Sequence, residues 1–521
     1  MKNIFVVFAL FGLFMSCSNK DNEVEIEKIP HEDISDDIFL DYLLSNFDAD
    51  SDGAISIEEA KAVKELDLSS IEGSLQSLKG IEYFTSLEKL TVKNQTQLDV
   101  PDLSKNVALT EFIWERSGDG AKVVDFSKNI NLKTLYYNSD ADVDLDISNN
   151  TALENLQLQY GATVTSFKNN TSLKNVLIAG WPHGRAIDFT DNTLLEDLYI
   201  LMYTNASSHD YAETILNISN CKNLTNLYIA GVGIRSLTLQ RANKLKDVFI
   251  ENCDSLKSLD FSGATNLENF RLDGMEEIGI NVSNCKNLRD LSSLTLLKKI
   301  TTLNASGCIG LKTFSWNADV GSQRILKHLD LSDCTSLTEI TCINSELEDL
   351  NLKGCTSLAR LNCGGNSLTK LDMSTCMHLE ELSCADNLLT EIDVSACKTL
   401  SALSCDNNQL KELDLSVCTG LVSLNCLENM LVELNLSGLL SLEVLVCQDN
   451  KLEELDVTDN IALKTILCLR NNLSILDLHT CHALETVNSN GNDNLQLLIL
   501  YKNHQIKNLY YDDFTQIEYK E

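Results

Sequence analysis

A twelve-residue stretch from residue 48 to residue 59 carries oxygen ligands at a regular spacing. Oxygens come from places one, three, five, seven (a backbone carbonyl), nine and twelve of the stretch, namely Asp48, Asp50, Asp52, Ala54, Ser56 and Glu59. A hard divalent cation needs about six to eight oxygens that converge on one point. The spacing of these residues therefore predicts a metal site built from a single short loop.

The stretch resembles the loop of the EF-hand, in which a glycine at the place of Gly53 makes the sharp turn. Apolar residues at helical spacing precede it from Ile38 to Phe47, and residues 58–64 can continue as a helix after it. We predict one calcium ion with a structural role, because EF-hand sensors usually pair two loops and this loop is single. The alternative is an acidic turn that has lost calcium binding.

A leucine repeat occupies most of the rest of the chain. Between residues 337 and 484 a leucine recurs every 21 residues and opens the pattern LxxLxCxxNxL, as in Leu400 to Leu410. This is the leucine-rich-repeat signature with cysteine in the sixth place. With looser spacing the same opening residue recurs backward to Leu87 and forward to Ile506, which gives about twenty coils.

One coil cannot bury its own leucines, so the coils must stack and the ends need caps. We predict a solenoid arc with a parallel β-sheet on the concave face and a small helical EF-hand-like cap at the N-terminus. The long coil after Leu195 should loop out around residues 203–214. The expected parts are a signal peptide (1–16), an acidic tether (17–29), the cap (30–86), irregular repeats (87–325), 21-residue repeats (326–494) and a C-terminal cap (495–521).

Most of the 18 cysteines fall into two columns. The first column holds the sixth place of the signature, and the second lies three residues before the opening leucine, where other coils have asparagine. Both are predicted to point inward as reduced thiols, because parallel in-register strands give poor geometry for a disulfide. The first column is Cys342, Cys363, Cys384, Cys405, Cys426, Cys447 and Cys468, and the second is Cys221, Cys285, Cys308, Cys334, Cys355, Cys376, Cys397, Cys418 and Cys481.

The repeats from Leu326 to Asn492 resemble the cysteine-ladder internalins, a bacterial group with 21-residue repeats of the form LxxLxCxxNxLxxLDVSxN. Between Leu87 and Leu326 the sixth place carries tryptophan, tyrosine, leucine or isoleucine instead. The resemblance implies a protein that binds host surface proteins or mediates adhesion, and that is not an enzyme.

The concave face should expose the third, fifth and seventh places of each signature, since alternate side chains of a strand point to opposite faces. The fifth place forms an aromatic and aliphatic row, from which we name as candidate partner-binding residues Tyr136, Tyr199, Tyr228, Phe249 and Arg271. Such a row fits an interface or a sugar-stacking platform. Alternatively, the side chains only shield each other along the sheet.

A second column follows the signature, in the sequence LDxS, where aspartates such as Asp372, Asp393 and Asp414 should point outward. We predict that they accept hydrogen bonds from turn amides. A cation-binding column is the alternative.

The N-terminus has the features of an exported lipoprotein. Lys2 precedes an apolar run from Ile4 to Phe14, which ends in Phe14-Met15-Ser16-Cys17. This resembles the lipobox, in which the cysteine is acylated, so Cys17 is the predicted lipidation site. We expect an outer-membrane lipid anchor with the protein exposed at the cell surface. The alternative is an ordinary secretory signal with an unrelated cysteine.

The net charge of −35 disfavours nucleic acid as a partner. Enzyme motifs such as GxSxG or HExxH do not occur, and the eight histidines lack metal-ligand spacing. Two functions therefore remain: an adhesin or receptor for an extracellular or host surface protein, and a glycan-binding surface lipoprotein of a nutrient-uptake system.

Overall fold

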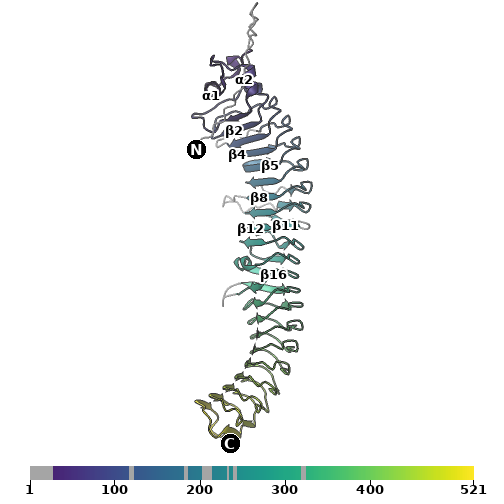
Figure 1. Ribbon diagram of the computed structural model, residues 1–521, viewed down its shortest axis with the longest axis vertical. Helices are drawn as coiled ribbons and strands as arrows, with labels where there is room; N and C mark the ends of the chain where they lie inside the picture. The colour runs from purple at the N-terminus through teal and green to yellow at the C-terminus, as the bar shows by residue number, and fades with distance from the viewer. Residues whose placement is uncertain are drawn as a thin grey trace, which may run out of the picture.

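The computed structural model describes residues 27–115, 123–180, 186–201, 214–231, 234–238, 243–317 and 324–521. The predicted signal peptide, Cys17 and nearly all of the predicted tether and loop-out at 203–214 lie outside these residues. Figure 1 shows one long, curved stack of coils with the helices at its N-terminal end. No helix among the described residues is long and apolar enough to cross a membrane.

The N-terminal end of the described chain, where we predict a cap, contains short helices and one strand. Helix α1 spans Asp37–Phe47 and begins where the Asp36 carboxylate accepts hydrogen bonds from two backbone amides. Helix α2 spans Ile57–Ala62 and begins with a capping box between Ser56 and Glu59. The other cap elements are the 3-10 helices η1 (His31–Asp33) and η2 (Ile81–Tyr83) and the strand β1 (Glu65–Asp67).

The signature strands form the predicted parallel sheet, which we call the signature face. Buried and half-buried side chains alternate along these strands, as a sheet with one buried face requires. The first ten-stranded sheet contains β1, β2 (Lys89–Lys93), β3 (Glu111–Glu115), β4 (Thr134–Leu145), β5 (Asn155–Val164), β6 (Asn175–Ala179), β8 (Asp197–Leu201), β10 (Asn226–Ala230), β12 (Asp247–Glu251) and β14 (Asn269–Asp273).

A second ten-stranded sheet continues the signature face to the C-terminal end. It contains β17 (Thr313–Ser315), β19 (Glu339–Thr341), β21 (Arg360–Asn362), β22 (Glu381–Ser383), β23 (Ala402–Ser404), β24 (Ser423–Asn425), β25 (Val444–Val446), β26 (Thr465–Leu467), β28 (Thr486–Asn488) and β30 (Asn508–Tyr510). Nineteen of the twenty predicted coils contribute a strand to these two sheets, and the remaining strand is β1.

The signature face is interrupted once, at the coil that opens with Leu288. Here the 3-10 helix η3 (Ser292–Leu296) replaces the expected strand between β14 and β17. The carboxylate of Asp290 accepts hydrogen bonds from the amide and the hydroxyl of Ser292, which turns the chain immediately after Leu291. The leucine pattern gave no indication of this break, because η3 still buries Leu294 in the core.

The LDxS half-repeats form further parallel strands on the opposite side, which the sequence did not predict. We call this side the LDxS face. One eight-stranded sheet contains β7 (Ile187–Asp188), β9 (Thr214–Asn217), β11 (Ile234–Thr238), β13 (Ser258–Asp260), β15 (Ile278–Asn281), β16 (Lys299–Asn304), β18 (Ile325–Asp330) and β20 (Asp349–Asn351). A three-stranded sheet near the C-terminus contains β27 (Ile475–Asp477), β29 (Leu497–Tyr501) and β31 (Gln516–Lys520).

Backbone pairing is therefore continuous on the signature face from β17 to β30, but it is interrupted on the LDxS face between β20 and β27. Coils tied together on one side and free on the other spread apart on the free side. In Figure 1 the C-terminal part of the stack bends accordingly, which places the signature face on the inner side of the curve.

Candidate functional site

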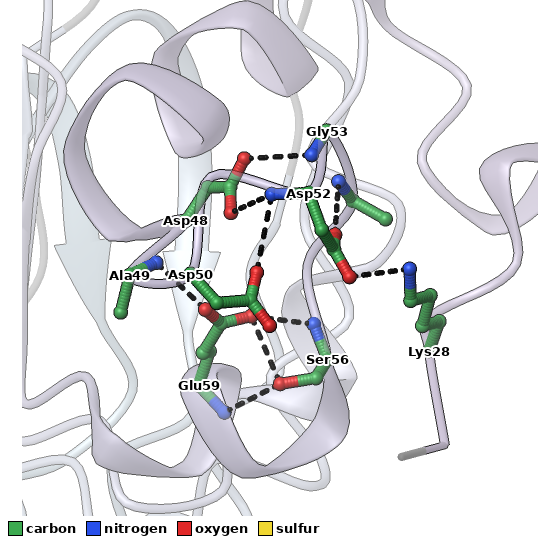
Figure 2. Close-up of polar contacts among 9 residues, drawn as sticks. Lys28, Asp48, Ala49, Asp50, Asp52, Gly53, Ser56 and Glu59 are labelled. Carbon is green, nitrogen blue, oxygen red and sulfur yellow. Dashed lines mark hydrogen bonds and ion pairs between the residues drawn. The ribbon is translucent and has the colours of Figure 1, made fainter. Parts of the chain in front are cut away.

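The predicted metal-binding loop lies between α1 and α2 (Figure 2). Carboxylate oxygens of Asp48, Asp50 and Asp52 all lie within 4.8 Å of one another. Asp48 accepts hydrogen bonds from the amides of Asp52 and Gly53 at 3.1 and 3.0 Å, so the aspartates also fold the loop around themselves. Gly53 has φ +81°, the left-handed conformation that the turn at this place requires.

The other predicted ligands hold the ends of the loop together. Glu59 accepts hydrogen bonds from the amide of Ala49 at 2.7 Å and from the amide and hydroxyl of Ser56 at 2.8 and 2.9 Å. Although partial burial opposes it, these hydrogen bonds lower the pKa of Glu59. Ala54 donates its amide to Asp52 at 3.0 Å. The donor set suits a hard cation, with three carboxylates converging and a fourth placed at the loop's base.

A short N-terminal segment takes the place where a second EF-hand loop would pair. The amide of Ile29 donates to the carbonyl of Ile55 at 2.9 Å, and the amide of Ile57 donates to the carbonyl of Glu27 at 2.8 Å. The side chain of Ile55 is buried in the cap. The end of the loop is thus attached to the segment around residues 27–29 by backbone hydrogen bonds.

Lys28, in the same segment, is a residue that the sequence analysis missed. Its Nζ lies 2.5 Å from Asp52 Oδ2 (Figure 2). This hydrogen bond lowers the pKa of Asp52 and raises the pKa of Lys28. Lys28 therefore partly neutralises the carboxylate cluster, and a bound cation competes with it for Asp52.

The five candidate partner-binding residues lie in one row of the signature face. Tyr199, Tyr228, Phe249 and Arg271 are directly paired neighbours in β8, β10, β12 and β14. Tyr136 lies in the same row in β4, three strands before Tyr199. The register thus places every member of the predicted row at the same height across the sheet.

The aromatic side chains of this row stack on one another. The ring centroids of Tyr199 and Tyr228 are 6.4 Å apart, and those of Tyr228 and Phe249 are 6.3 Å apart, with interplanar angles of 27° and 35°. Tyr199 keeps 38% of its surface exposed, whereas Tyr228 and Phe249 are half-buried. The aromatic side chains of the row therefore shield one another in part and also remain partly exposed to solvent.

Polar groups and a shallow hollow border the row. Arg271 lies 3.9 Å from Glu251, and the Tyr228 hydroxyl lies 3.3 Å from the same carboxylate. A hollow of about 250 Å³ opens over β4 to β8, with Tyr136 and Tyr199 in its lining. Burial raises the pKa of the Tyr136 phenol, whose hydroxyl donates to Gln159 at 3.0 Å.

The aspartates of the LDxS face make the predicted hydrogen bonds. Asp372, Asp393 and Asp414 each accept the amide two residues further along the chain at 2.9 Å. These bonds lower the pKa of all three carboxyl groups. The cation-binding alternative for the column has no converging group: among the described residues, the three loop aspartates form the one cluster whose ligand atoms lie within 4.8 Å of one another.

Both cysteine columns are buried and reduced, as predicted. Their environments differ. Second-column thiols such as Cys355 donate to a carbonyl of the preceding coil, here Leu331 at 3.1 Å, while buried asparagines such as Asn192 donate to the same kind of carbonyl. First-column thiols such as Cys405 are fully buried next to the thiols of the neighbouring coils, here Cys384 and Cys426. Burial raises the pKa of Cys355 to about 12 and that of Cys405 well above its usual value.

The asparagine in the ninth place of the signature connects the coils, a role that the sequence analysis did not assign. Asn429 donates to the carbonyls of Cys405 and Cys426 at 3.0 and 3.2 Å and accepts the amide of Leu410 at 3.0 Å. The same three bonds recur at Asn387, Asn408, Asn450 and Asn471. The constant spacing of this asparagine was the feature of the sequence that could have indicated its role.

No family model and no curated protein matches the sequence. Among solved structures, the chain is similar to the functional domain of InlJ from Listeria monocytogenes, which includes a cysteine ladder (20% identity, 92% of this chain and 84% of that chain, TM-score 0.35). It is also similar to YopM from Yersinia enterocolitica (19%, 88% and 92%, 0.34) and to a leucine-rich-repeat protein from Leptospira interrogans (16%, 81% and 94%, 0.32). The chain's own repeat and its stacked parallel strands make it a leucine-rich-repeat solenoid with a buried cysteine ladder.

Proposed function

We propose that this chain is a binding protein of a bacterial cell surface, not an enzyme, and that its signature face holds an extracellular protein partner. The observation that carries the proposal is the row that runs from Tyr136 to Arg271. These side chains lie outside the core, and rigid aromatic rings beside an arginine are typical of the centre of protein interfaces. The inner side of a curved solenoid also gives a partner a large surface to contact.

The way in which the rings stack favours a protein over the glycan alternative. Sugars bind to the flat face of an aromatic ring. In this row the ring of Tyr199 stacks on that of Tyr228 and the ring of Phe249 lies tilted beside Tyr228, so neighbouring rings cover part of one another and leave less open ring face for a sugar. Edges and hydroxyls suit the mixed apolar and polar surface of a protein.

The experiment is a pull-down from host-cell extracts, together with a glycan array, using the chain without residues 1–17. A triple variant, Tyr199→Ala with Tyr228→Ala and Phe249→Ala, should lose the captured protein. The matched control removes three exposed aromatic residues at the far end of the stack, Tyr510, Tyr511 and Phe514. Equal capture by both variants, or binding to the array alone, would contradict the proposal.

We also propose that the loop from Asp48 to Glu59 binds one calcium ion, which would stabilise the cap over the first coils. Support comes from the three converging carboxylates and from the attachment of Ile55 to Ile29. Calorimetric titration with calcium should give one site that Asp50→Ala, which removes a ligand oxygen, abolishes. Asp41→Ala, at an exposed position on α1, is the control.

A substitution of Lys28 gives a second test of the calcium site. Because Lys28 pairs with Asp52, Lys28→Gln should tighten calcium binding and leave the stoichiometry at one. Absence of calcium binding by the unsubstituted chain, or an unchanged affinity in Asp50→Ala, would show that the loop is only an acidic turn.

We infer further that Cys17 carries a lipid and anchors the chain to the outer membrane. The support is the apolar run that ends at Cys17. Cys17→Ser should release the protein from the membrane fraction and abolish incorporation of a labelled fatty acid, and an anchored, labelled Cys17→Ser variant would disprove the inference.

A further inference from the structure

A long groove runs along the LDxS face of the regular repeats. It has a volume of about 1280 Å³ and is lined by seven successive coils, from His328 and Asp330 to Glu454 and Asp456. It lies on the opposite side of the solenoid from the aromatic row, so the proposed function does not use it.

The groove opens where the LDxS segments of neighbouring coils form no continuous strand ladder, although backbone bonds such as that from the amide of Leu388 to the carbonyl of Leu368 join the coils at the start of these segments. Within residues 326–521, all of which the structure describes, the bridge between Asp372 and Asp393 is the one strand-type pairing on the LDxS face between β20 and β27. Apolar residues in the floor become slightly exposed as a result. Ile392 and Leu413 are 8% and 6% exposed, whereas Leu476, in the paired strand β27, is fully buried.

The walls of the groove are strongly acidic. Ten carboxylates and one lysine, Lys370, line it, in two parallel columns: Asp349, Glu391, Glu412, Glu433 and Glu454 in one, and Asp330, Asp372, Asp393, Asp414 and Asp456 in the other. Across residues 326–521, none of the four glutamates forms an ion pair.

The signature face of the same coils is different. There Arg360 lies 2.7 Å from Glu339, and Lys464 lies 2.7 Å from Glu443 on the neighbouring coil. The chain thus pairs several glutamates with basic side chains on the signature face and leaves the four glutamates of the groove without an ion pair.

We propose that this groove binds an extended, lysine- and arginine-rich segment of a partner protein. Such a segment places a positive charge beside each coil, and its side chains carry only hydrogen-bond donors, which complement the carboxylates of the groove. Their apolar stems can lie on the leucine floor. A single metal ion does not fit, because the groove carboxylates do not converge as those of Asp48, Asp50 and Asp52 do.

The test measures binding of a fluorescent ten-residue peptide of alternating lysine and arginine to the full chain by anisotropy. The groove variant replaces four exposed glutamates by glutamine, at Glu391, Glu412, Glu433 and Glu454. Its affinity should fall by about tenfold or more, because four interactions are lost together. Added salt should weaken binding to the unsubstituted chain.

A charge-matched control separates the groove from the general negative charge of the protein. It replaces four exposed glutamates outside the groove by glutamine, at Glu346, Glu380, Glu381 and Glu428. This control should bind the peptide within about twofold of the unsubstituted chain, since the groove is intact. Equal losses in both variants, no binding at all, or equally tight binding of spermine would overturn the proposal. Circular dichroism of both variants shows that the solenoid remains folded.

Discussion

At the scale of single residues, the cysteines show how one residue type serves two purposes in this solenoid. In the first column a thiol fills a narrow apolar space between leucines, and in the second column it donates to a carbonyl that asparagine satisfies in other coils. A thiol can do both because it is small, largely apolar and a weak donor. The two columns therefore respond differently to the same substitution.

Serine at Cys405 should destabilise the protein by ~1–3 kcal/mol, because it places a hydroxyl at a fully buried position where the thiol donates no hydrogen bond. Serine at Cys355 should cost far less, since its hydroxyl can donate to the carbonyl of Leu331. Denaturant unfolding of the two variants measures the difference. Equal midpoints would show that the columns are energetically alike.

The thiols should also be chemically silent in the folded protein. Burial raises the pKa of second-column thiols such as Cys308 and Cys334 to about 12, so near pH 8 they stay protonated as well as inaccessible. In Cys17→Ser, Ellman's reagent should detect almost no thiol before unfolding and all of the remaining 17 in guanidinium chloride. Several fast-reacting thiols in the folded chain would contradict the buried columns.

At the scale of the elements, the ninth-place asparagines compensate for short strands. The regular repeats have signature strands of three residues, which give few ladder hydrogen bonds, and each asparagine adds three bonds between and within coils. Backbone N–H and C=O groups that the short strands leave unpaired are thereby hydrogen-bonded by side chains.

Asn429→Ala should therefore destabilise the chain by ~2–4 kcal/mol, because it leaves a buried amide and two carbonyls without their partner. Asn429→Asp keeps the acceptor for Leu410 but loses both donors, so it should not rescue stability. Asn435, on the LDxS face, accepts one amide from Ser437 and is exposed, and Asn435→Ala is the mild control. Unfolding midpoints compare the three; similar values would refute the bridging role.

The sequence predicted the strictly repeating elements and missed the irregular ones. Leucine spacing located the signature strands and placed Tyr199, Tyr228 and Phe249 in one row. It could do so because, in a solenoid, residues at the same place of successive repeats become neighbours in the sheet. It did not predict η3, where the side chain of Asp290 overrides the pattern, nor the unpaired groove. The pairing of Lys28 with Asp52 depends on how the N-terminal segment folds back, which no local pattern contains.

At the scale of the whole molecule, the described part of the chain is a stack in which the strands of each coil pair with those of its neighbours. Its stability should then depend on the number of coils and on the continuity of the columns. A fold with a single closed core has no equivalent property, because removal of any element would leave a hole.

Deletion of residues 400–420, one full period, should give a folded protein. Thr399 then precedes Leu421, so the leucine, cysteine and asparagine columns stay in register with one coil fewer. Circular dichroism should be unchanged per residue, and in a Cys17→Ser background the 15 remaining thiols should all be protected. Deletion of residues 400–410 removes half a coil and brings signature strands against LDxS segments; it should expose thiols of the following coils. If both deletions fold equally well, or if the full-period deletion unfolds the chain, the coils are not interchangeable units.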